Sequence, residues 1–381
     1  MNISKIDIEE FLIPATIYDY DVVVELLYDI YQVKNNSEKY TIDTIVRDIL
    51  ENKAKMEVIY NSRKQKLAAL KQLKLPEQRT PEWYAMRKEK LTASSLGSAI
   101  EKCHFQTREE LLLSKIEDKP YEPNEITEWG VKYEDVAIAF YEEMHNVKIL
   151  DFGMIPHPTF EAFGASPDGI CDDTGNDPFV ARMVEIKCPP KRKFTKSVPH
   201  HYWMQVQGQL EVCDLDHCDF FQVKIEEYDN YDDYLKDIFV DDDKILPGRT
   251  YLNYPKGVTV SYRKKDEIKL TYLYPKLNMT NDGYNDWIKE KKIEILENGD
   301  EYVESKWWKI TRYECTLIER DYEWWNENVE HILKFYTDME ECKRDPERLA
   351  ELKAKIAESK KKSSKKEVKV DDFALISDEE D

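Results

Sequence analysis

Cysteine is scarce in this sequence and is not arranged for a disulfide framework. The 381 residues include seven cysteines, at positions 103, 171, 188, 213, 218, 315 and 342, and no two of them form a CxxC pair. An odd number without paired spacing argues against a disulfide-stabilised secreted protein. We therefore expect a reducing, intracellular compartment.

Long hydrophobic runs are also missing. No stretch of about 18 apolar residues occurs, which argues against a membrane-spanning helix, and the first thirty residues are acidic and interrupted by charges. A secretory signal peptide has a basic start followed by an apolar segment, so these residues do not resemble one. We expect a soluble protein that is not secreted and makes no membrane contact.

A net positive charge, which phosphate binding favours, is absent from the sequence as a whole. The 77 acidic side chains outnumber the 56 basic ones, and the formal net charge is −21. Residues 182–201 are an exception, because six basic residues stand there against the single acid Glu185, a local balance of +5. This basic island consists of Arg182, Lys187, Lys191, Arg192, Lys193 and Lys196. It is either a solvated loop after a strand or a local surface for a polyanion.

The first 75 residues have a helical pattern. Apolar residues such as Val22, Leu26 and Ile30 recur at the spacing of one face of an α-helix. Pro76 interrupts this pattern, and Thr80-Pro81 is typical of a helix start. We therefore predict a helical N-terminal extension over residues 1–75, whose function the sequence does not indicate.

Helical and strand patterns alternate from residue 76 to about residue 228. A long helix is predicted over residues 129–147, because its apolar residues, including Tyr133 and Phe140, fall on one face. The predicted strand segments are 148–155, 164–173, 181–189 and 220–225, and a further helix is predicted over 202–213. Strands interleaved with helices predict an α/β (α+β) fold with a central mixed sheet flanked by helices.

The remaining sequence is less regular. Residues 229–300, rich in Asp, Tyr and Asn, are predicted to be an insertion or a β-rich elaboration, followed by a strand and an amphipathic helix that complete a domain over residues 76–342. The charged residues 343–381 are predicted to be a disordered tail. Its lysines, at positions 360–362, 365 and 366, mark an interaction tail or a nuclear address, or serve solubility alone.

Two short segments point to chemistry. GASPDGI (164–170) places Asp168 in a tight turn, and VEIKCP (184–189) places Glu185 and Lys187 two positions apart. Side chains two apart in a strand project from one face, so Ile186 faces the other way. Asp168, Glu185 and the Ile186 carbonyl are oxygen ligands suited to a divalent cation, with Lys187 placed to hold a water molecule. Taken singly, the two segments are equally those of a surface turn and a charged edge strand.

Glu134 is a third carboxylate candidate. It lies beside Tyr133, at the rim of the apolar stripe of the predicted helix, so its carboxylate can emerge at the edge of the core and face the sheet. Asp135 is the obvious competitor, and helix geometry alone does not choose between the two.

Five motifs, taken in order, carry a family resemblance. They are RTPEWYAMRKEKLTASSLG (79–97), ITEWGVKYEDVAIAFYEEM (126–144), FGASPDGI (163–170), MVEIKCP (183–189) and YWMQVQGQLEV (202–212). The chain resembles the lambda-exonuclease-like viral recombinase (YqaJ) family of PD-(D/E)xK nucleases, and LIERDYEWW (317–325) is similar to the strand and helix that close that domain. The resemblance covers about 76–228 continuously and 303–340 more loosely. It implies a restriction-endonuclease-like core and makes 76–342 a lambda-exonuclease-like nuclease domain with an insertion at about 229–300.

The resemblance also implies roles for residues around the cation. Asp168 and Glu185 would ligate Mg²⁺ or Mn²⁺, Glu134 would support that metal site, and Lys187 would be the catalytic lysine. Gln205, which opens the Q-V-Q motif, would lie near the catalytic water and the scissile phosphate. From the residues alone, Gln205 is equally a solvated helix residue.

A second implied site is a pocket for a 5′-phosphate. It would consist of Arg87, four residues after Trp83, and Ser94 of the T-A-S motif. A helix starting at Thr92 would add free N–H groups, and Arg87 a bidentate donor. The alternative is that Arg87 pairs with Glu82 or Glu89 on its own helix.

Cysteine and histidine residues near position 210 raise a zinc alternative. His200, His201, Cys213, His217 and Cys218 lie within 19 residues, but their spacings match none of the usual zinc patterns. The four flanking cysteines that hold an iron-sulfur cluster in some nucleases of this superfamily have no counterpart here.

The sequence thus predicts a metal-dependent DNA exonuclease, acting 5′-to-3′ on duplex ends in viral recombination or genome processing. The alternatives are an endonuclease or RNA-cleaving nuclease of the same superfamily, and a non-catalytic nucleic-acid-binding protein. The expected partners are double-stranded DNA ends, a single-strand annealing protein and, as a homo-oligomer, further copies in a trimer. The expected location is the host cytoplasm or the nucleus.

Overall fold

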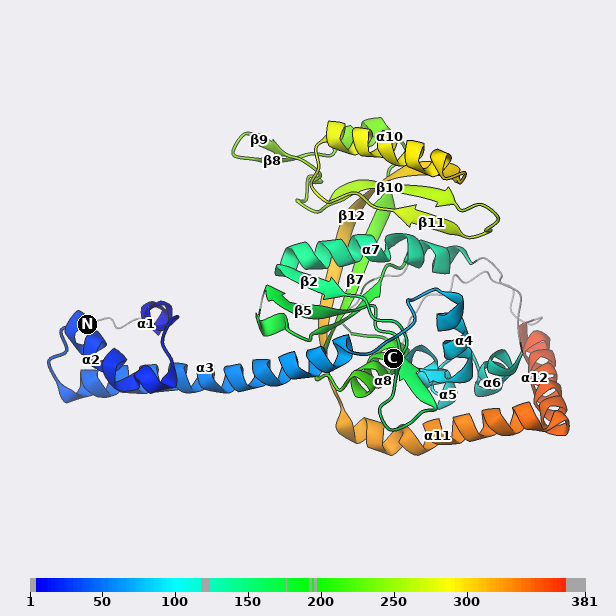
Figure 1. Ribbon diagram of the computed structural model, residues 1–381, viewed down its shortest axis with the longest axis horizontal. Coiled ribbons are helices and arrows are strands. Elements are labelled where there is room, and N and C mark those ends of the chain that lie inside the picture. Colours follow the sequence, from blue (N-terminus) through cyan, green and yellow to red (C-terminus); the bar gives the residue numbers. More distant parts are fainter. Residues whose placement is uncertain (1–4, 118–123, 176, 192–193, 195–196, 368–381) are drawn as a thin grey trace. The chain divides into compact units, whose positions relative to one another are not determined.

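The computed structural model describes residues 5–117, 124–175, 177–191, 194 and 197–367 (Figure 1). Contacts within the chain divide it into two units, Met1–Gln72 and Leu73–Asp381. None of the helices in these ranges combines the length and the hydrophobicity needed to cross a lipid bilayer.

The first unit is helical in its described part. It contains α1 (Lys5–Phe11), a 3-10 turn (Ile17–Asp19), α2 (Tyr20–Ile30) and α3 (Asn36–Lys71). The Asn35 side chain caps α3 by accepting a hydrogen bond from the Glu38 N–H at 3.0 Å. The small core includes Leu12, Leu27 and Val46. The apolar spacing of α2 has a second face that is not part of this core, since Val22, Leu26 and Ile30 are 65%, 48% and 58% exposed.

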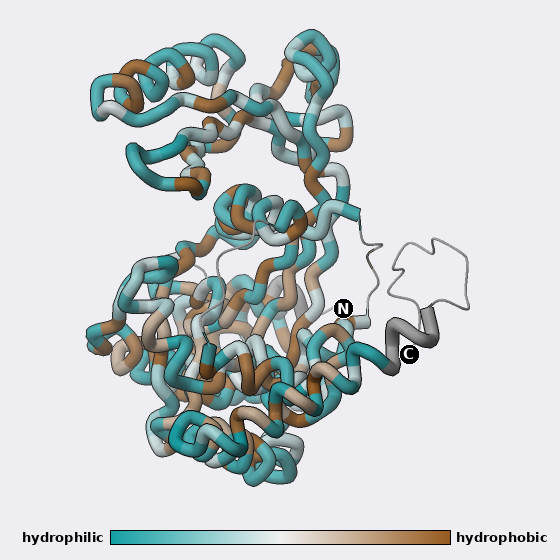
Figure 2. The backbone as a smooth tube through the Cα atoms, turned by 90° about the vertical axis from the view of Figure 1, so that its right-hand side faces the viewer, coloured by the Kyte–Doolittle hydropathy of each residue, from teal (hydrophilic) through white to brown (hydrophobic). Residues whose placement is uncertain are grey.

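The second unit is built on a seven-stranded mixed sheet, in the order β11-β10-β12-β7-β6-β5-β2. Only the β6–β7 pairing is parallel among these strands. The strands are β2 (Val147–Leu150), β5 (Gly169–Gly175), β6 (Met183–Lys187), β7 (His217–Glu227), β10 (Lys256–Arg263), β11 (Leu270–Leu273) and β12 (Glu301–Glu319). Hydrophobic and hydrophilic stretches alternate along the chain (Figure 2). The predicted α/β class with a central mixed sheet is confirmed.

Two smaller sheets accompany the large one. One has the order β1-β4-β3, formed by β1 (Leu91–Thr92), β4 (Phe163–Ala165) and β3 (Ile155–Pro156). The other is the hairpin of β8 (Phe239–Asp241) and β9 (Lys244–Leu246). Residues 148–155, predicted as one strand, are therefore split between β2 and β3. The chain turns at Gly153, where an added Cβ would lie 1.8 Å from the Pro76 carbonyl oxygen.

Helices flank the large sheet (Figure 1). The long helix α7 (Glu125–His145) packs its apolar face on β6 and β7, so that Tyr133, Phe140, Ile186 and Phe221 share one core. It starts four residues before the predicted helix because Asn124 caps it through the Ile126 N–H at 2.9 Å. The other helices are α4 (Pro81–Glu89), α5 (Leu96–Ala99), α6 (Arg108–Ile116), α8 (His200–Cys213), α9 (Tyr231–Lys236), α10 (Asn281–Glu297), α11 (Tyr322–Arg344) and α12 (Pro346–Glu367).

Residues 229–300 elaborate the sheet. β10 and β11 extend it beyond β12, and the 19-residue strand β12 pairs with β10 along its first part and with β7 along its second. The register shifts between Ile310 and Arg312, near the change from one partner strand to the other. α10 packs above this end of the sheet through Tyr284 (Figure 1).

The tail differs from the disordered segment predicted for residues 343–381. Residues 346–367 form α12, because Leu352 and Ile356, each 8% exposed, give this charged segment an apolar contact face. Ion pairs from Lys353 to Glu117 and from Lys355 to Glu109 also join α12 to α6 and the residue after it. Residues 368–381 and the side chains from 362 onward, including most of the lysine cluster, lie outside the described residues.

Candidate active site

The Ser-Pro-Asp-Gly turn joins β4 to β5 and places Asp168 against β6. The Ile186 N–H donates a hydrogen bond to Asp168 Oδ2 at 2.7 Å. The turn is held from outside by the Trp83 indole N–H, 3.0 Å from Ser166 Oγ, and by the Gln78 amide, 3.1 Å from the Pro167 carbonyl oxygen. These contacts fix the position of the carboxylate at the edge of the sheet.

Glu185 is the buried centre of the site, with its side chain only 1% exposed. On strand β6, Glu185 and Lys187 project to the face covered by α8, and Ile186 enters the core under α7. The Lys187 ammonium pairs with Glu185 Oε1 and lies 4.0 Å from Asp168 Oδ2. The strand alternation predicted for Glu185 and Lys187 is thus observed.

Two glutamines of α8 complete the environment of Glu185. Gln205 Nε2 donates to Glu185 Oε1 at 2.6 Å, so this glutamine faces the site instead of lying in solvent. Gln209, one turn later, donates to Glu185 Oε2 at 2.8 Å. The sequence reasoning omitted Gln209, although its position four residues after Gln205 places it on the same helix face.

The charges of the site act strongly on one another. Burial and the neighbouring Glu185 raise the pKa of the Asp168 carboxyl well above its usual range, and Lys187 offsets part of that rise. Burial alone would lower the pKa of the Lys187 ammonium, but Glu185 and Asp168 outweigh it and raise that pKa above its ordinary value. Lys187 is therefore a charged ammonium at neutral pH.

Glu134 lies near this cluster and Asp135 is less involved. Burial raises the pKa of the Glu134 carboxyl, which also interacts with Lys187 and Glu185. The Asp135 carboxyl is perturbed by burial and by Arg79. Arg79 Nη2 lies 2.9 Å from Glu134 Oε1 and is a residue that the sequence reasoning missed. Its backbone φ of 66° arises in the bend before α4, and no sequence pattern signalled it.

Arg87 and Ser94 lie together, as the predicted phosphate pocket requires. Arg87 Nη2 donates to Ser94 Oγ at 3.2 Å, and its guanidinium stacks 4.4 Å from the centre of the Trp83 ring. The described contacts of Arg87 are thus with Ser94 and Trp83, and not with Glu82 or Glu89. Burial lowers the pKa of Arg87, while the negative charge of Asp168 acts against that change.

The helix predicted after Thr92 is much shorter than expected. A 3-10 turn (Ala93–Ser95) is followed by the four-residue helix α5, and the Thr92 hydroxyl contacts Ser94 Oγ and Ser95 Oγ, each at 3.2 Å, instead of capping a helix. So short a helix contributes little dipole, and a phosphate here would depend on the Arg87 guanidinium and the serine hydroxyls.

A buried lysine supports α4 from behind. Lys115 of α6 is 9% exposed and donates to the Arg87 carbonyl oxygen at 2.6 Å. Burial, reinforced by the positive charge of Arg87, lowers its pKa to about 7. Lys115 is a second residue that the sequence did not signal.

The carboxylates fit a divalent cation chemically. Asp168, Glu185 and Glu134 offer hard oxygen ligands. Burial, and after it the negative charge of Glu185, raises the pKa of Asp168, and a doubly charged cation would stabilise its ionised form. In the structure, the positive charges of Lys187 and Arg79 compensate part of the negative charge of these carboxylates. Among the described residues, no three His, Cys, Asp or Glu side chains lie close enough together to form a ready set of metal ligands. That includes the five residues of the zinc alternative.

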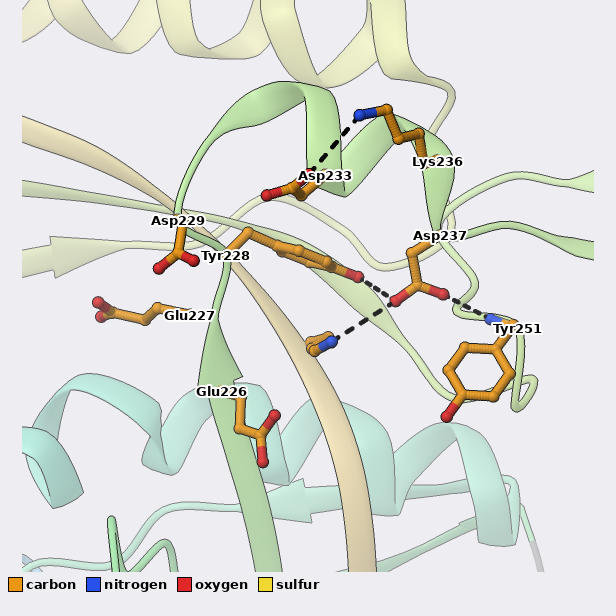
Figure 3. Close-up of a pocket in the computed structure, with 9 residues that line it drawn as sticks. Glu226, Glu227, Tyr228, Asp229, Asp233, Lys236, Asp237 and Tyr251 are labelled. Carbon is orange, nitrogen blue, oxygen red and sulfur yellow. Dashed lines mark hydrogen bonds and ion pairs between the residues drawn. The ribbon is translucent and has the colours of Figure 1, made fainter.

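A pocket in the β10–β12 part of the unit lies apart from this site (Figure 3). Asp237 accepts hydrogen bonds there from the Tyr228 hydroxyl at 2.6 Å and the Tyr251 N–H at 2.7 Å. Further acids line it, including Glu226, Glu227, Asp229 and Asp233. This charge is unsuited to a phosphate, and the pocket is not the candidate active site.

The structure describes three of the six residues of the basic island. Arg182 is tied to Asp219 at 2.9 Å and packs over the Phe179 ring, away from the Glu185 cluster. Lys187 belongs to the site and Lys191 is exposed. Arg192, Lys193 and Lys196 lie outside the described residues.

Comparison with known proteins places this site in a family. Residues 82–216 match the model of the YqaJ-like viral recombinase domain. The uncharacterized protein R354 of Acanthamoeba polyphaga mimivirus is 30% identical over 305 residues, which cover 73% of this chain and 55% of that relative. The chain therefore spans about half the length of the curated relative that it matches.

The solved structures that the chain matches include two exonucleases. The alkaline exonuclease LHK-Exo of Laribacter hongkongensis is 22% identical, with 75% of this chain and 99% of that chain covered and a TM-score of 0.37. A phage-related exonuclease of Haemophilus somnus 129PT is 15% identical, with 65% and 90% covered and a TM-score of 0.34. The match of residues 82–216 to the YqaJ-like viral recombinase domain agrees with the resemblance that the five motifs carry.

Proposed function

We propose that this protein is a metal-dependent DNA nuclease, and specifically an exonuclease that digests one strand 5′-to-3′ from duplex ends. The observation that supports it best is the buried Glu185 carboxylate, shared by Lys187, Gln205 and Gln209, with Asp168 4.0 Å from the same ammonium. An ion pair that serves stability alone needs one positive partner for the carboxylate. The Glu185 carboxylate instead has three hydrogen-bond donors and lies beside a second acid, Asp168, as a metal-binding carboxylate would.

In this proposal the carboxylates hold the cation. Asp168, Glu185, the Ile186 carbonyl and Glu134 would hold Mg²⁺ or Mn²⁺, which supplies Lewis-acid charge at the phosphate and lowers the pKa of a bound water. Lys187, kept positively charged by its two acids, orients the attacking water and balances charge on the phosphate. Gln205 fixes both Glu185 and the water through its amide.

The Arg87 pocket gives the proposal its end preference. A terminal 5′-phosphate would accept hydrogen bonds from the Arg87 guanidinium and the Ser94 hydroxyl, which lie 3.2 Å apart. Arg87 is within electrostatic reach of Asp168, so a phosphate bound there lies near the cleavage site. An enzyme that grips a 5′-phosphate beside its cleavage site would begin at an end.

A nuclease of this kind would serve viral recombination or genome processing. Removal of one strand exposes the other for a single-strand annealing partner, and assembly as a ring-shaped trimer would keep the enzyme on its DNA. The setting would be the host cytoplasm or the nucleus.

One digestion experiment tests the function. The purified protein is incubated with Mg²⁺, with Mn²⁺ or with EDTA, on linear duplexes labelled at either end, with or without a 5′-phosphate, beside a closed circle and a matched RNA duplex. We expect metal-dependent loss of 5′-phosphorylated strands from their 5′ ends and an intact circle. Cutting of the closed circle would favour an endonuclease, and cutting of the RNA duplex would favour the RNA-cleaving alternative. DNA binding without digestion in the presence of either metal would favour a non-catalytic binding protein.

The matched variants separate catalysis from binding. Asp168→Asn keeps the shape of the turn and its hydrogen-bond acceptor but removes the charge, so digestion should fall by at least about 10²-fold while DNA affinity persists. Asp173→Asn, on the same strand β5 but exposed, is the control and should retain activity. Equal activity of Asp168→Asn and the parent would exclude the proposed centre.

A further inference from the structure

The hairpin of β10 and β11 presents basic side chains on a protein that is acidic overall. Its turn, residues 263–269, contains Arg263, Lys264, Lys265 and Lys269 against two acids, Asp266 and Glu267. Arg263 pairs with Glu301 at the base, while Lys264, Lys265 and Lys269 are exposed. Asp300 also accepts a hydrogen bond from the Lys265 N–H at 3.0 Å, so the acids around the hairpin balance its bases in number. What remains is three exposed lysine side chains that can each bind a phosphate.

The hairpin reaches the helix that carries the phosphate pocket. Lys269 Nζ lies 3.4 Å from the Tyr84 hydroxyl and 4.9 Å from the centre of the Tyr84 ring. Tyr84 is 46% exposed and lies three residues before Arg87, so both project from one side of α4. Lys269, Tyr84 and Arg87 therefore form a continuous row from the hairpin to the pocket.

The returning strand of the hairpin is fixed beside the acidic cluster. After β11, the Tyr274 hydroxyl donates to the Lys132 carbonyl oxygen of α7 at 2.8 Å, two residues before Glu134. Burial first and then the negative charge of Asp135 raise the pKa of the Tyr274 hydroxyl, and Arg79 acts against that rise. The hairpin is thus anchored at both ends of the candidate active site.

We propose that the β10–β11 hairpin is a DNA-backbone arm of the active site. Lys269, positioned by Tyr84, would bind a phosphate beyond the terminal one held by Arg87, and Lys264 and Lys265 would bind further phosphates of the duplex. The arm lies outside the family domain of residues 82–216. This inference rests on the proposed function, because it takes DNA as the substrate.

A second hairpin of the same chain serves as the control. The β8–β9 hairpin also exposes a lysine, Lys244, but its turn contains Asp241, Asp242 and Asp243. Loss of Lys244 removes one positive charge from an exposed hairpin, as loss of Lys269 does. The difference between the two variants therefore reports position and not net charge.

The test measures DNA binding by fluorescence anisotropy, with the full chain, a labelled 5′-phosphorylated duplex and EDTA, over a series of salt concentrations. Each phosphate contact contributes about 0.9 to the slope of log affinity against log salt. We expect Lys269→Ala, the variant matched in charge to Lys244→Ala, to lower this slope by about 1. Lys264→Ala/Lys265→Ala/Lys269→Ala should lower it by about 2 to 3 and weaken binding at 0.1 M salt by roughly tenfold or more. Lys244→Ala should leave both unchanged.

The outcomes separate the arm from the enzyme. Digestion by the parent together with the expected loss in the triple variant supports both proposals. Digestion by the parent with an unchanged slope in the triple variant, or an equal effect of Lys244→Ala, overturns the arm and leaves the function. No digestion by the parent with a hairpin-specific loss of binding supports the arm and contradicts the function.

Discussion

Gln209 donates a hydrogen bond from Nε2 to Glu185 Oε2 at 2.8 Å, in a place where both residues are almost completely buried. When a buried carboxylate oxygen loses its hydrogen-bond donor, its desolvation is no longer compensated and the folded state is destabilised. The position of the carboxylate is then fixed by fewer hydrogen bonds. This relationship makes Gln209 a positioning residue for the proposed metal ligand.

Gln209→Leu should therefore destabilise the second unit by about 1–3 kcal/mol and also reduce kcat. The measurements are urea unfolding and single-turnover digestion at a temperature where the variant is folded. Gln207→Leu is the matched control, since Gln207 is equally buried on α8 but bonds the Glu319 carbonyl oxygen at 2.9 Å. It should lose similar stability and keep its kcat; equal losses of kcat would deny Gln209 a special role.

Removal of Arg79 should make the site more dependent on a cation. Arg79 is a positive partner of Glu134, so Arg79→Gln leaves the buried acids with less compensation. We expect a lower melting temperature without metal and a larger rise on adding Mn²⁺ than the parent shows. Arg79→Lys should restore most of the parent behaviour. A smaller rise with Mn²⁺ in Arg79→Gln would instead make the arginine a supporter of metal binding.

Arg87→Ala should abolish the preference for 5′-phosphorylated ends. Loss of its charge-assisted hydrogen bonds predicts about a 10- to 100-fold drop in kcat/KM on phosphorylated duplexes and little change on unphosphorylated ones. Paired digestion rates on the two substrates measure the effect. A proportional loss on both substrates would mean that Arg87 supports the fold of α4 alone.

Gly169→Ala should damage the turn that presents Asp168. An added Cβ would lie 2.2 Å from Cγ2 of Ile149, which overpacks the β2–β5 contact and costs about 1–3 kcal/mol. Ile149→Ala, which deletes that methyl group, should make the glycine substitution less costly. Gly130→Ala is the control, because nothing lies within 4 Å of its added Cβ on α7, and it should stabilise the helix. Unfolding in urea compares the parent with the three single variants and with the Gly169→Ala/Ile149→Ala double variant.

Because the pKa of Lys115 is lowered in the folded protein, this lysine makes the free energy of unfolding rise with pH above neutrality. Its pKa falls from 10.5 to about 7 on folding, so between these values the unfolded chain binds more protons and stability rises with pH, by at most about 1.4 kcal/mol per unit. Below about pH 7 the cost of the buried charge is fully present. Relative to Lys115→Met, the parent should gain stability from pH 7 to pH 10. Lys102→Met removes an exposed lysine and keeps Lys115, so the stability difference between it and the parent should not change with pH. If the pH profiles of Lys115→Met and the parent were parallel, the assignment to Lys115 would be contradicted.

The sequence was most informative where the geometry is local. Side chains two apart in a strand must share a face, which is why Glu185 and Lys187 could be paired before any coordinates. Asn124, in contrast, extended α7 by a capping hydrogen bond that the apolar period of the helix does not report.

Long-range pairing was beyond the sequence. Residues 229–300 contained visible strands, but only their pairing with β12 shows that they join the seven-stranded sheet instead of forming a separate lobe. Arg79 reaches Glu134 across 55 positions through a bend with positive φ, and Lys115 reaches Arg87 across 28. Such contacts depend on how separate elements pack, and no spacing rule encodes them. The charged α12 was missed because two apolar residues were enough to seat it.

The strand β12 has a mechanical consequence. It is hydrogen-bonded to β10 on one part and to β7 on the other, and β7 is bonded in turn to the strand that carries Glu185. A pull exerted on the β10–β11 hairpin along the strands would therefore be borne by three successive ladders of backbone hydrogen bonds before it reached the strand that carries Glu185.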